Sequence, residues 1–139
     1  MKHVDKILIV DDDQTSTFLV KTMLEDMQIA SAIATATNGR EALDYINAQC
    51  LATEKEANLI AATFCPELIL LDINMPVMNG FEFLEECRQK QCFRGNQVKV
   101  VMLSSSSSAK DIQQAKAFHV TAYLVKPITE EKLTQLLSY

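Results

Sequence analysis

Hydrophobic positions along the chain fall into two alternating patterns. Short, dense apolar runs rich in Ile, Val and Leu are typical of strands that a parallel sheet buries on both faces. Between these runs, apolar residues recur every three or four positions, as at Leu19, Met23 and Met27, which predicts amphipathic helices. The predicted strands are 6–10, 32–36, 68–71, 98–103 and 121–125.

Local signals support helices after each strand. Asn38 and Asn79, each followed by glycine, are suited to open the second and third helices, and Thr129 is suited to cap the fifth. Glu130 and Glu131 then lie in the first turn of that fifth helix, where carboxylates stabilise the positive end of the helix dipole.

Strand and helix alternate along the whole chain, which predicts βαβ units with right-handed crossovers and one parallel sheet covered by helices on both faces. The fold class is therefore α/β, with a doubly wound five-stranded sheet and five helices. Only the 48–66 connection is longer than one helix requires, and we interpret it as a second helical segment or an extended helix.

Length and composition limit the functional classes. A chain of 139 residues suits one domain, and a net charge of −5 without a Lys/Arg-rich block argues against intrinsic nucleic-acid binding. No apolar run approaches a signal peptide or a membrane span, so we expect no membrane insertion and a cytoplasmic location. The four cysteines form no CxxC pair and are expected to be reduced thiols that pack as small hydrophobes.

Polar residues follow directly after four of the predicted strands. In an open parallel sheet, functional groups gather beyond the carboxyl ends of the strands, so these residues are expected to converge. They are Asp11, Asp12 and Asp13 after the first strand, Asp72 after the third, Ser104 and Ser105 after the fourth, and Lys126 with Pro127 after the fifth.

This set of groups suits phosphoryl chemistry. Mg²⁺ prefers oxygen ligands and commonly takes one or two carboxylates together with phosphate oxygens. A carboxylate can accept a phosphoryl group covalently, while the Lys126 ammonium and the Ser104 hydroxyl stabilise its oxygens. Taken singly, each residue has a plainer explanation, such as a helix cap, a loop acid or a solvated lysine. Their joint occurrence at four strand ends favours a site.

Four segments in this order, ILIVDDD, LILLDINMPVMNGFEFL, VVMLSSS and YLVKPI, resemble the receiver domain of two-component response regulators, the CheY-like family. The resemblance covers essentially the whole chain. It implies a flavodoxin-like sheet with strand order 2-1-3-4-5. It also implies a phosphoprotein of a phosphorelay that takes its phosphoryl group from a kinase phosphohistidine in a Mg²⁺-dependent reaction. Because the sequence ends with the fifth predicted helix, we expect a stand-alone receiver domain over 1–139 without an effector domain.

The resemblance also implies roles for the acidic residues. Asp72 corresponds to the phosphoacceptor, and Asp11 and Asp12 join it as metal ligands. Asn74 would supply a backbone carbonyl to the metal. The negative charge of Asp72, directly after a buried strand, is then compensated by a cation and by Lys126.

The remaining motif positions are those that respond to the phosphoryl group. Lys126 matches the family's lysine, Ser104 its switch hydroxyl and Tyr123 its aromatic switch residue. Pro127 follows Lys126 in a bond that the family usually holds cis. The phosphodonor would be a histidine kinase or a histidine phosphotransfer protein, and the downstream target protein would bind the fourth helix, fifth strand and fifth helix.

The chain departs from the family pattern at two places, and two alternatives stay open. His119 replaces a glycine usual after the fourth helix, which predicts local strain or a reshaped helix end. The other departure is the long 48–66 stretch. A haloacid-dehalogenase-like phosphatase would use Asp11 as nucleophile and Asp13 as acid, but leaves the Asp72 segment unexplained. An unphosphorylated adaptor is the other alternative. Beyond self-phosphotransfer and autodephosphorylation, no enzyme activity is expected.

Overall fold

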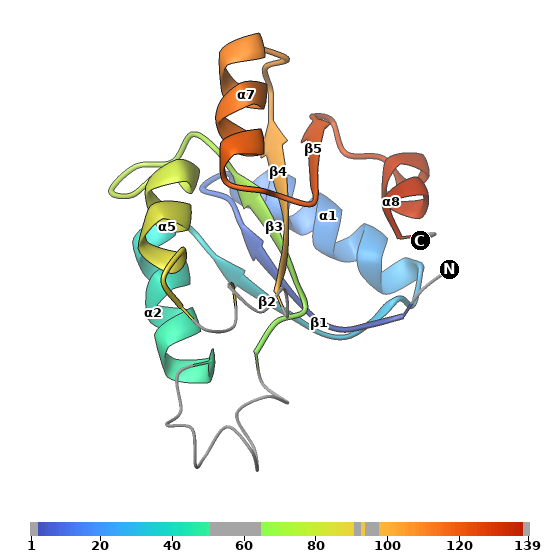
Figure 1. Ribbon diagram of the computed structural model, residues 1–139. Helices are drawn as coiled ribbons and strands as arrows, with labels where there is room; N and C mark the ends of the chain where they lie inside the picture. Colours follow the sequence, from blue (N-terminus) through green and yellow to red (C-terminus); the bar gives the residue numbers. More distant parts are fainter. Residues whose placement is uncertain (1–2, 51–64, 91–92, 94–97, 138–139) are drawn as a thin grey trace.

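The computed structural model describes residues 3–50, 65–90, 93 and 98–137, and they form a five-stranded parallel sheet flanked by helices (Figure 1). The strand order is β2-β1-β3-β4-β5, which confirms the predicted doubly wound fold. The strands are β1 (Val4–Val10), β2 (Ala30–Ala36), β3 (Leu68–Asp72), β4 (Lys99–Ser104) and β5 (Ala122–Val125). The helices of the described residues are α1 (Gln14–Asp26), α2 (Gly39–Cys50), α5 (Gly80–Cys87), α7 (Ala109–Ala117) and α8 (Glu130–Leu136).

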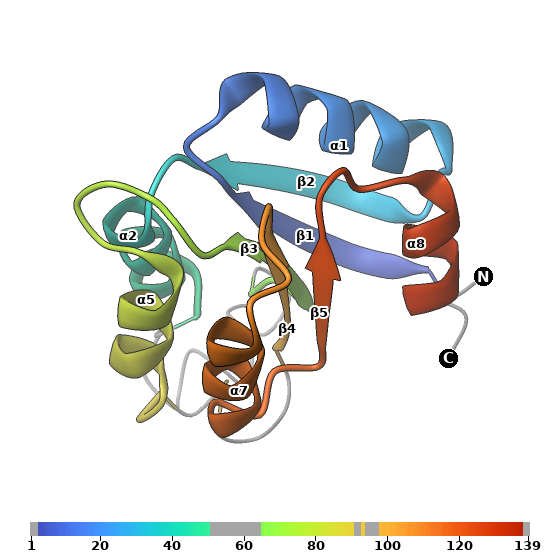
Figure 2. The same ribbon diagram turned by 90° about the horizontal axis from the view of Figure 1, so that it is seen from above.

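Two layers of helices cover the sheet. Figure 2 shows α1 and α8 on one face, and α2, α5 and α7 on the other. Because side chains alternate along a strand, neighbouring residues of the central strands enter different cores. In β3, Ile69 and Leu71 pack beneath α2 and α5, whereas Leu68 and Leu70 pack beneath α1 and α8. This two-sided burial explains why the strands are continuous apolar runs.

The strand register brings four chain segments together at one edge of the sheet. Val10 pairs with Leu71, Asp72 with Leu103, and Ser104 with Val125. The residues that follow β1 and β5, Asp11 and Lys126, are therefore carried to the same edge as Asp72 and Ser104. The chain leaves β1 for β2 on one side and later returns to β3 on the other, so this edge contains the topological switch point where α/β sheets bind ligands.

Close backbone approach fixes the loop between β3 and α5. The Gly80 N–H donates to the Ile73 carbonyl at 2.9 Å, and a Cβ on Gly80 would lie 2.5 Å from the Asp72 carbonyl oxygen. Only glycine fits there without displacing the Asp72 backbone. Asn79 caps α5 in a reciprocal capping box with Glu82. The Asn-Gly pair thus both starts the helix and holds the β3 end in place.

The two departures from the family pattern have different outcomes. His119 adopts a φ of 58°, so the residue in the glycine position ends α7 in the left-handed conformation, as expected. The predicted second helical segment within 48–66 lies mostly outside the described residues, which include it only as far as the end of α2 at Cys50 and again from Cys65.

The cysteine prediction is wrong for one pair. Cys50 and Cys65 form a disulfide, with 4.8 Å between their Cα atoms. Cys50 ends α2 and Cys65 lies shortly before β3, so the fold brings together two residues whose spacing in the sequence gave no such signal. Cys87 keeps its thiol and is buried, as predicted, and Cys92 lies outside the described residues.

Within the described part of the chain, no helix has both the length and the apolar character needed to cross a membrane.

Candidate functional site

Three carboxylates meet where β1 and β3 end. Asp11 and Asp72 are buried, with 3% and 7% of their surfaces exposed, whereas Asp12 is exposed. One ligand oxygen from each lies within 4.8 Å of the others. Because like charges this close repel, the cluster requires a compensating positive charge.

Lys126 supplies part of that charge from the end of β5. Its Nζ lies 2.9 Å from Asp11 Oδ2 and 3.6 Å from Asp72 Oδ1. The other Asp11 oxygen, Oδ1, accepts the Asp13 N–H at 2.9 Å. Both oxygens of Asp11 are therefore engaged within the protein, while Asp72 is held less tightly by the ammonium.

Burial and charge raise the pKa of Asp72 to about 6 from an ordinary value of 3.8. The largest cause is loss of solvent, followed by repulsion from Asp11; Lys126 opposes both. For Lys126, burial alone lowers the pKa, but the hydrogen bond to Asp11 and the attraction of Asp72 raise it above its ordinary value. The ammonium is thus fixed in its charged form beside carboxylates that repel one another.

The donor set fits a hard divalent cation. Three carboxylates from two strand ends converge, one of them solvent-exposed, which suits Mg²⁺ because it keeps several waters and takes few protein oxygens. Asn74, predicted to add a backbone carbonyl, lies exposed two residues after Asp72. Asp13, the third acid of the run, instead caps α1, because its Oδ1 accepts the N–H groups of Thr15 and Ser16.

The neighbouring strand ends carry the predicted hydroxyl and aromatic residues. Ser104 is 1% exposed, and its Oγ accepts the Ser106 N–H at 3.0 Å. The Tyr123 hydroxyl, on β5, donates to the Ser106 carbonyl at 2.8 Å. Ser106 therefore connects Ser104 and Tyr123 directly. The Lys126–Pro127 peptide bond, which the resemblance expects to be cis, is cis.

The match to known sequences agrees with this geometry. The family model of the response regulator receiver domain matches residues 7–138. This chain belongs to that family. Receiver domains are the phosphoacceptor modules of two-component systems, generally use Mg²⁺, and act with histidine kinases and downstream target proteins.

Individual relatives of the receiver domain differ in length. The transcriptional regulatory protein CitT of Halalkalibacterium halodurans is 33% identical over 137 residues, which cover 99% of this chain but 52% of CitT. The probable methanogenesis regulatory protein FilR2 of Methanothrix harundinacea is 29% identical, with 91% of this chain and 75% of FilR2 covered. The chain therefore spans about half of one relative and three quarters of the other.

Solved structures confirm the fold of the receiver domain. A two component response regulator from Cytophaga hutchinsonii has a TM-score of 0.80 at 30% identity, covering 97% of this chain and 95% of that one. The chemotaxis protein CheY4 of Vibrio cholerae has a TM-score of 0.74 at 32% identity, covering 96% and 95%.

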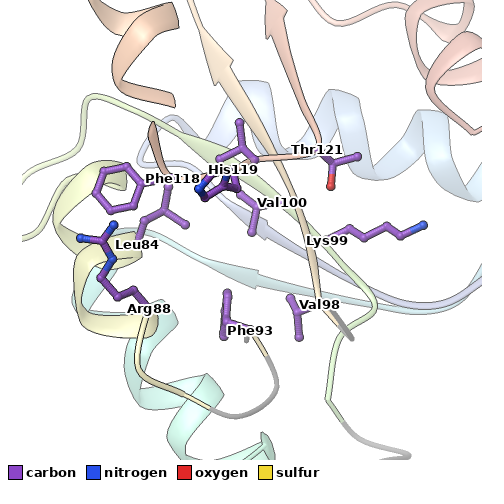
Figure 3. Close-up of a pocket in the computed structure, with 10 residues that line it drawn as sticks. Leu84, Arg88, Phe93, Val98, Lys99, Val100, Phe118, His119 and Thr121 are labelled. Carbon is purple, nitrogen blue, oxygen red and sulfur yellow. The ribbon is translucent and has the colours of Figure 1, made fainter. Parts of the chain in front are cut away.

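Two hollows in the described part of the chain lie away from the acidic cluster. Figure 3 shows one of about 440 Å³ between the ends of α5 and α7, lined by Leu84, Phe118 and Val100 with Arg88 at its rim. It opens at the amino ends of β4 and β5, whereas the carboxylates lie at the carboxyl ends of β1 and β3. The acidic site itself consists of two buried carboxylates, Asp11 and Asp72, beside the exposed Asp12.

Two features near the site were missed by sequence reasoning. The backbone of Ser106 links Ser104 to Tyr123, and no residue type marks a position that acts through its main chain. Lys132, in α8, donates to two carbonyls beside Lys126. A lysine six positions after Lys126 could have been noticed only with the loop geometry known.

Proposed function

We propose that this receiver domain accepts a phosphoryl group on Asp72 from a phosphohistidine and signals the change to a protein partner. The observation that carries the proposal is Lys126, which approaches both Asp11 and Asp72 at the junction of β1 and β3. An ammonium there can balance the charge of a phosphoryl oxygen that arrives beside the acids.

The choice between the two buried acids rests on their hydrogen bonds. Asp11 uses Oδ2 for Lys126 and Oδ1 for the Asp13 N–H, so it is poorly placed as a nucleophile. Asp72 keeps a longer contact, 3.6 Å, to the ammonium. This difference supports Asp72 as acceptor and counts against a phosphatase mechanism through Asp11.

In the proposed transfer, a carboxylate oxygen of Asp72 attacks the phosphorus of the phosphohistidine. The P–N bond breaks, its electron pair stays on the imidazole nitrogen, and an aspartyl phosphate forms. Mg²⁺, held by Asp11, Asp12 and Asp72 with the Asn74 carbonyl, would neutralise phosphoryl oxygens. Lys126 pairs with another oxygen, and the Ser104 hydroxyl donates to a third. Hydrolysis of the acyl phosphate by water gives autodephosphorylation.

Exposed apolar side chains mark the place where a phosphodonor protein would dock. Phe18 and Leu19 on α1 are 67% and 57% exposed, and Val77 in the β3–α5 loop is 80% exposed. Both segments leave the acidic cluster directly. Large apolar side chains exposed around a charged site favour burial against a partner. We assign this rim to the histidine kinase or histidine phosphotransfer protein, whose histidine must reach Asp72.

The output is proposed to pass from Ser104 to Tyr123. If Ser104 moves toward the phosphoryl group, its bond to the Ser106 N–H shifts the backbone that accepts the Tyr123 hydroxyl. Releasing Tyr123 then changes the face formed by α7, β5 and α8, which we assign to the downstream target. A coupling of about 1 to 3 kcal/mol would change partner affinity roughly 5- to 150-fold.

The decisive experiment is incubation with Mg²⁺ and a small phosphodonor, followed by intact mass measurement and peptide mapping. We expect one phosphoryl adduct on Asp72, lost in Asp72→Asn and absent when Mg²⁺ is chelated. An adduct on Asp11 would select the phosphatase mechanism. Absence of any adduct in the folded wild-type protein would select the unphosphorylated adaptor.

The relay is tested with Ser104→Ala, which still carries Asp72. Labelling should continue, while NMR shifts around Tyr123 on addition of a phosphoryl mimic should shrink. If the NMR shifts around Tyr123 in this variant were as large as in wild type, the coupling would have to run through Lys126 or the main chain.

We also propose a cytoplasmic location and a single receiver domain over 1–139 as the working unit. The Cys50–Cys65 disulfide is evidence against the cytoplasmic location, since disulfides are rare in reducing compartments. Alkylating the protein at the moment of cell lysis decides the point, because two unmodified cysteines per chain would contradict a reduced cytoplasmic form.

A further inference from the structure

Lys132 occupies an unusual place for a cation. It is the third residue of α8, in the first turn, where the positive end of the helix dipole disfavours a positive charge. Thr129 caps this turn and accepts the Lys132 backbone N–H at 3.2 Å. The lysine side chain points back toward the loop that precedes the helix, as helical side chains commonly do, and an interaction with that loop holds it there.

That interaction is a pair of hydrogen bonds to the main chain. Lys132 Nζ donates to the Val125 carbonyl at 2.6 Å and to the Pro127 carbonyl at 2.9 Å. These two carbonyls belong to the residues on either side of Lys126. In addition, the Lys126 N–H itself donates to the Ser104 carbonyl at 2.7 Å. The backbone of Lys126 is thus held from α8 and from β4 together.

We propose that Lys132 is a positioning residue that holds the Lys126 backbone, so that the Lys126 ammonium reaches Asp11 and Asp72. The inference rests on the proposed function, because in that function the position of Lys126 Nζ determines whether the ammonium can pair with a phosphoryl oxygen. A side chain reaching 2.9 Å from one carboxylate and 3.6 Å from another depends on where its main chain begins. β5 is an edge strand of only four residues, so the sheet alone constrains this loop from one side.

The test compares three variants. Lys132→Met keeps most of the aliphatic stem and removes the donors, Lys132→Arg restores donors, and Lys110→Met removes a cation from the equivalent first turn of α7. The first readout is the ¹³Cε NMR signal of Lys126 in the metal-free protein, which reports the ammonium's surroundings without any phosphoryl transfer. The second is the rate of Asp72 labelling by a small phosphodonor at saturating Mg²⁺.

We expect Lys132→Met to move the Lys126 signal toward that of a solvated lysine and to slow labelling three- to tenfold. Lys132→Arg should recover at least half of both effects, and Lys110→Met should leave both within twofold of wild type. If Lys132→Met does not fold, Lys132→Gln, which keeps one donor group, replaces it.

Two outcomes overturn the inference. One is a Lys132→Met protein whose Lys126 signal and labelling rate equal those of wild type, and the other is an equal loss in Lys110→Met, which would reveal a general charge effect. Failure of the proposed function appears differently, as absence of label in wild type. In that case the Lys126 signal alone still decides whether Lys132 positions it.

Discussion

The two halves of the site are built differently. The acid half comprises Asp11, Asp12 and Asp72 at the ends of β1 and β3, and the donor half comprises Ser104 and Lys126 at the ends of β4 and β5. β1, β3 and β4 all lie inside the sheet, and every residue of β3 is buried. β5, which carries Lys126, lies at the edge and is only half-buried throughout.

Under the proposed function, this difference would separate binding by the acids from the response of the donor residues. Asp11 and Asp72 are buried at the ends of two interior strands, so their mutual repulsion cannot be relieved by moving apart. In the donor half, Lys126 and the serine loop that follows Ser104 are held by hydrogen bonds between side chains and main chain, such as Tyr123 to Ser106, which can be exchanged at small cost. Charge added among the acids is therefore expected to move the donor half and leave the acid half in place.

The largest expected effect concerns Mg²⁺ affinity. A substitution in the acid half should lower this affinity, and a substitution of the lysine in the donor half should raise it. Asp12→Ala removes a ligand and should weaken binding at least tenfold from a millimolar value. Lys126→Met removes a cation that competes for Asp11 and Asp72, so it should tighten binding several-fold. NMR titration with Mg²⁺ measures both, with Lys110→Met as the control for net charge. If Mg²⁺ affinity changed in the same direction in both variants, the distinction between the acid half and the donor half would be wrong.

The next effect, about 1 to 2 kcal/mol, concerns stability against pH in the metal-free protein. The folded pKa of Asp72, about 6, lies above its ordinary 3.8, so the folded state binds the proton more tightly. Stability from this group is present below pH 4 and is lost as pH rises through 6. A pKa shift of about two units would by itself correspond to a larger change in the free energy of unfolding, but residual solvation of the site reduces that change. Asp72→Asn should therefore be more stable than wild type at pH 7.

Urea unfolding at pH 4 and pH 7 measures this difference, with Asp26→Asn, at the far end of α1, as control. Asp72→Asn should lose less stability than wild type and the control between the two pH values. Equal pH dependence in all three proteins would show that Asp72 titrates at its ordinary value.

The smallest effect is expected for Tyr123→Phe. Loss of the hydroxyl removes one hydrogen bond to the Ser106 carbonyl, worth about 0.5 to 1.5 kcal/mol. Amide exchange in the serine loop after β4 should accelerate several-fold without a change in the amides of β1. Tyr45→Phe on α2 is the matched control. An unchanged serine loop would mean that Tyr123 does not restrain it.

Much of the fold could be predicted from the sequence because strand and helix signals are local. Continuous apolar runs mark strands buried on both faces, and the Asn-Gly pairs mark helix starts. The positions of Asp11, Asp72, Ser104 and Lys126 followed from one rule, that parallel strands deliver their carboxyl ends to one edge. The order of the strands came from the family resemblance, since local patterns contain no pairing information.

Features that depend on distant contacts could not be predicted. The Cys50–Cys65 disulfide requires the end of α2 to meet the start of β3, which spacing does not reveal. The link from Ser104 through the Ser106 backbone to Tyr123 likewise joins two strand ends, and it becomes visible only in the folded chain. Similarly, Lys132 resembles a solvated helix lysine until its two carbonyl partners are known.

The Cys50–Cys65 disulfide also has a consequence for engineering. It joins two points whose Cα atoms are 4.8 Å apart, at the end of the sheet opposite the carboxylates. A folded guest whose own ends lie close together can be joined at two such neighbouring points without stretching its host. The Cys50–Cys65 junction is therefore a suitable place to attach a fluorescent reporter, at the end of the sheet away from the carboxylates.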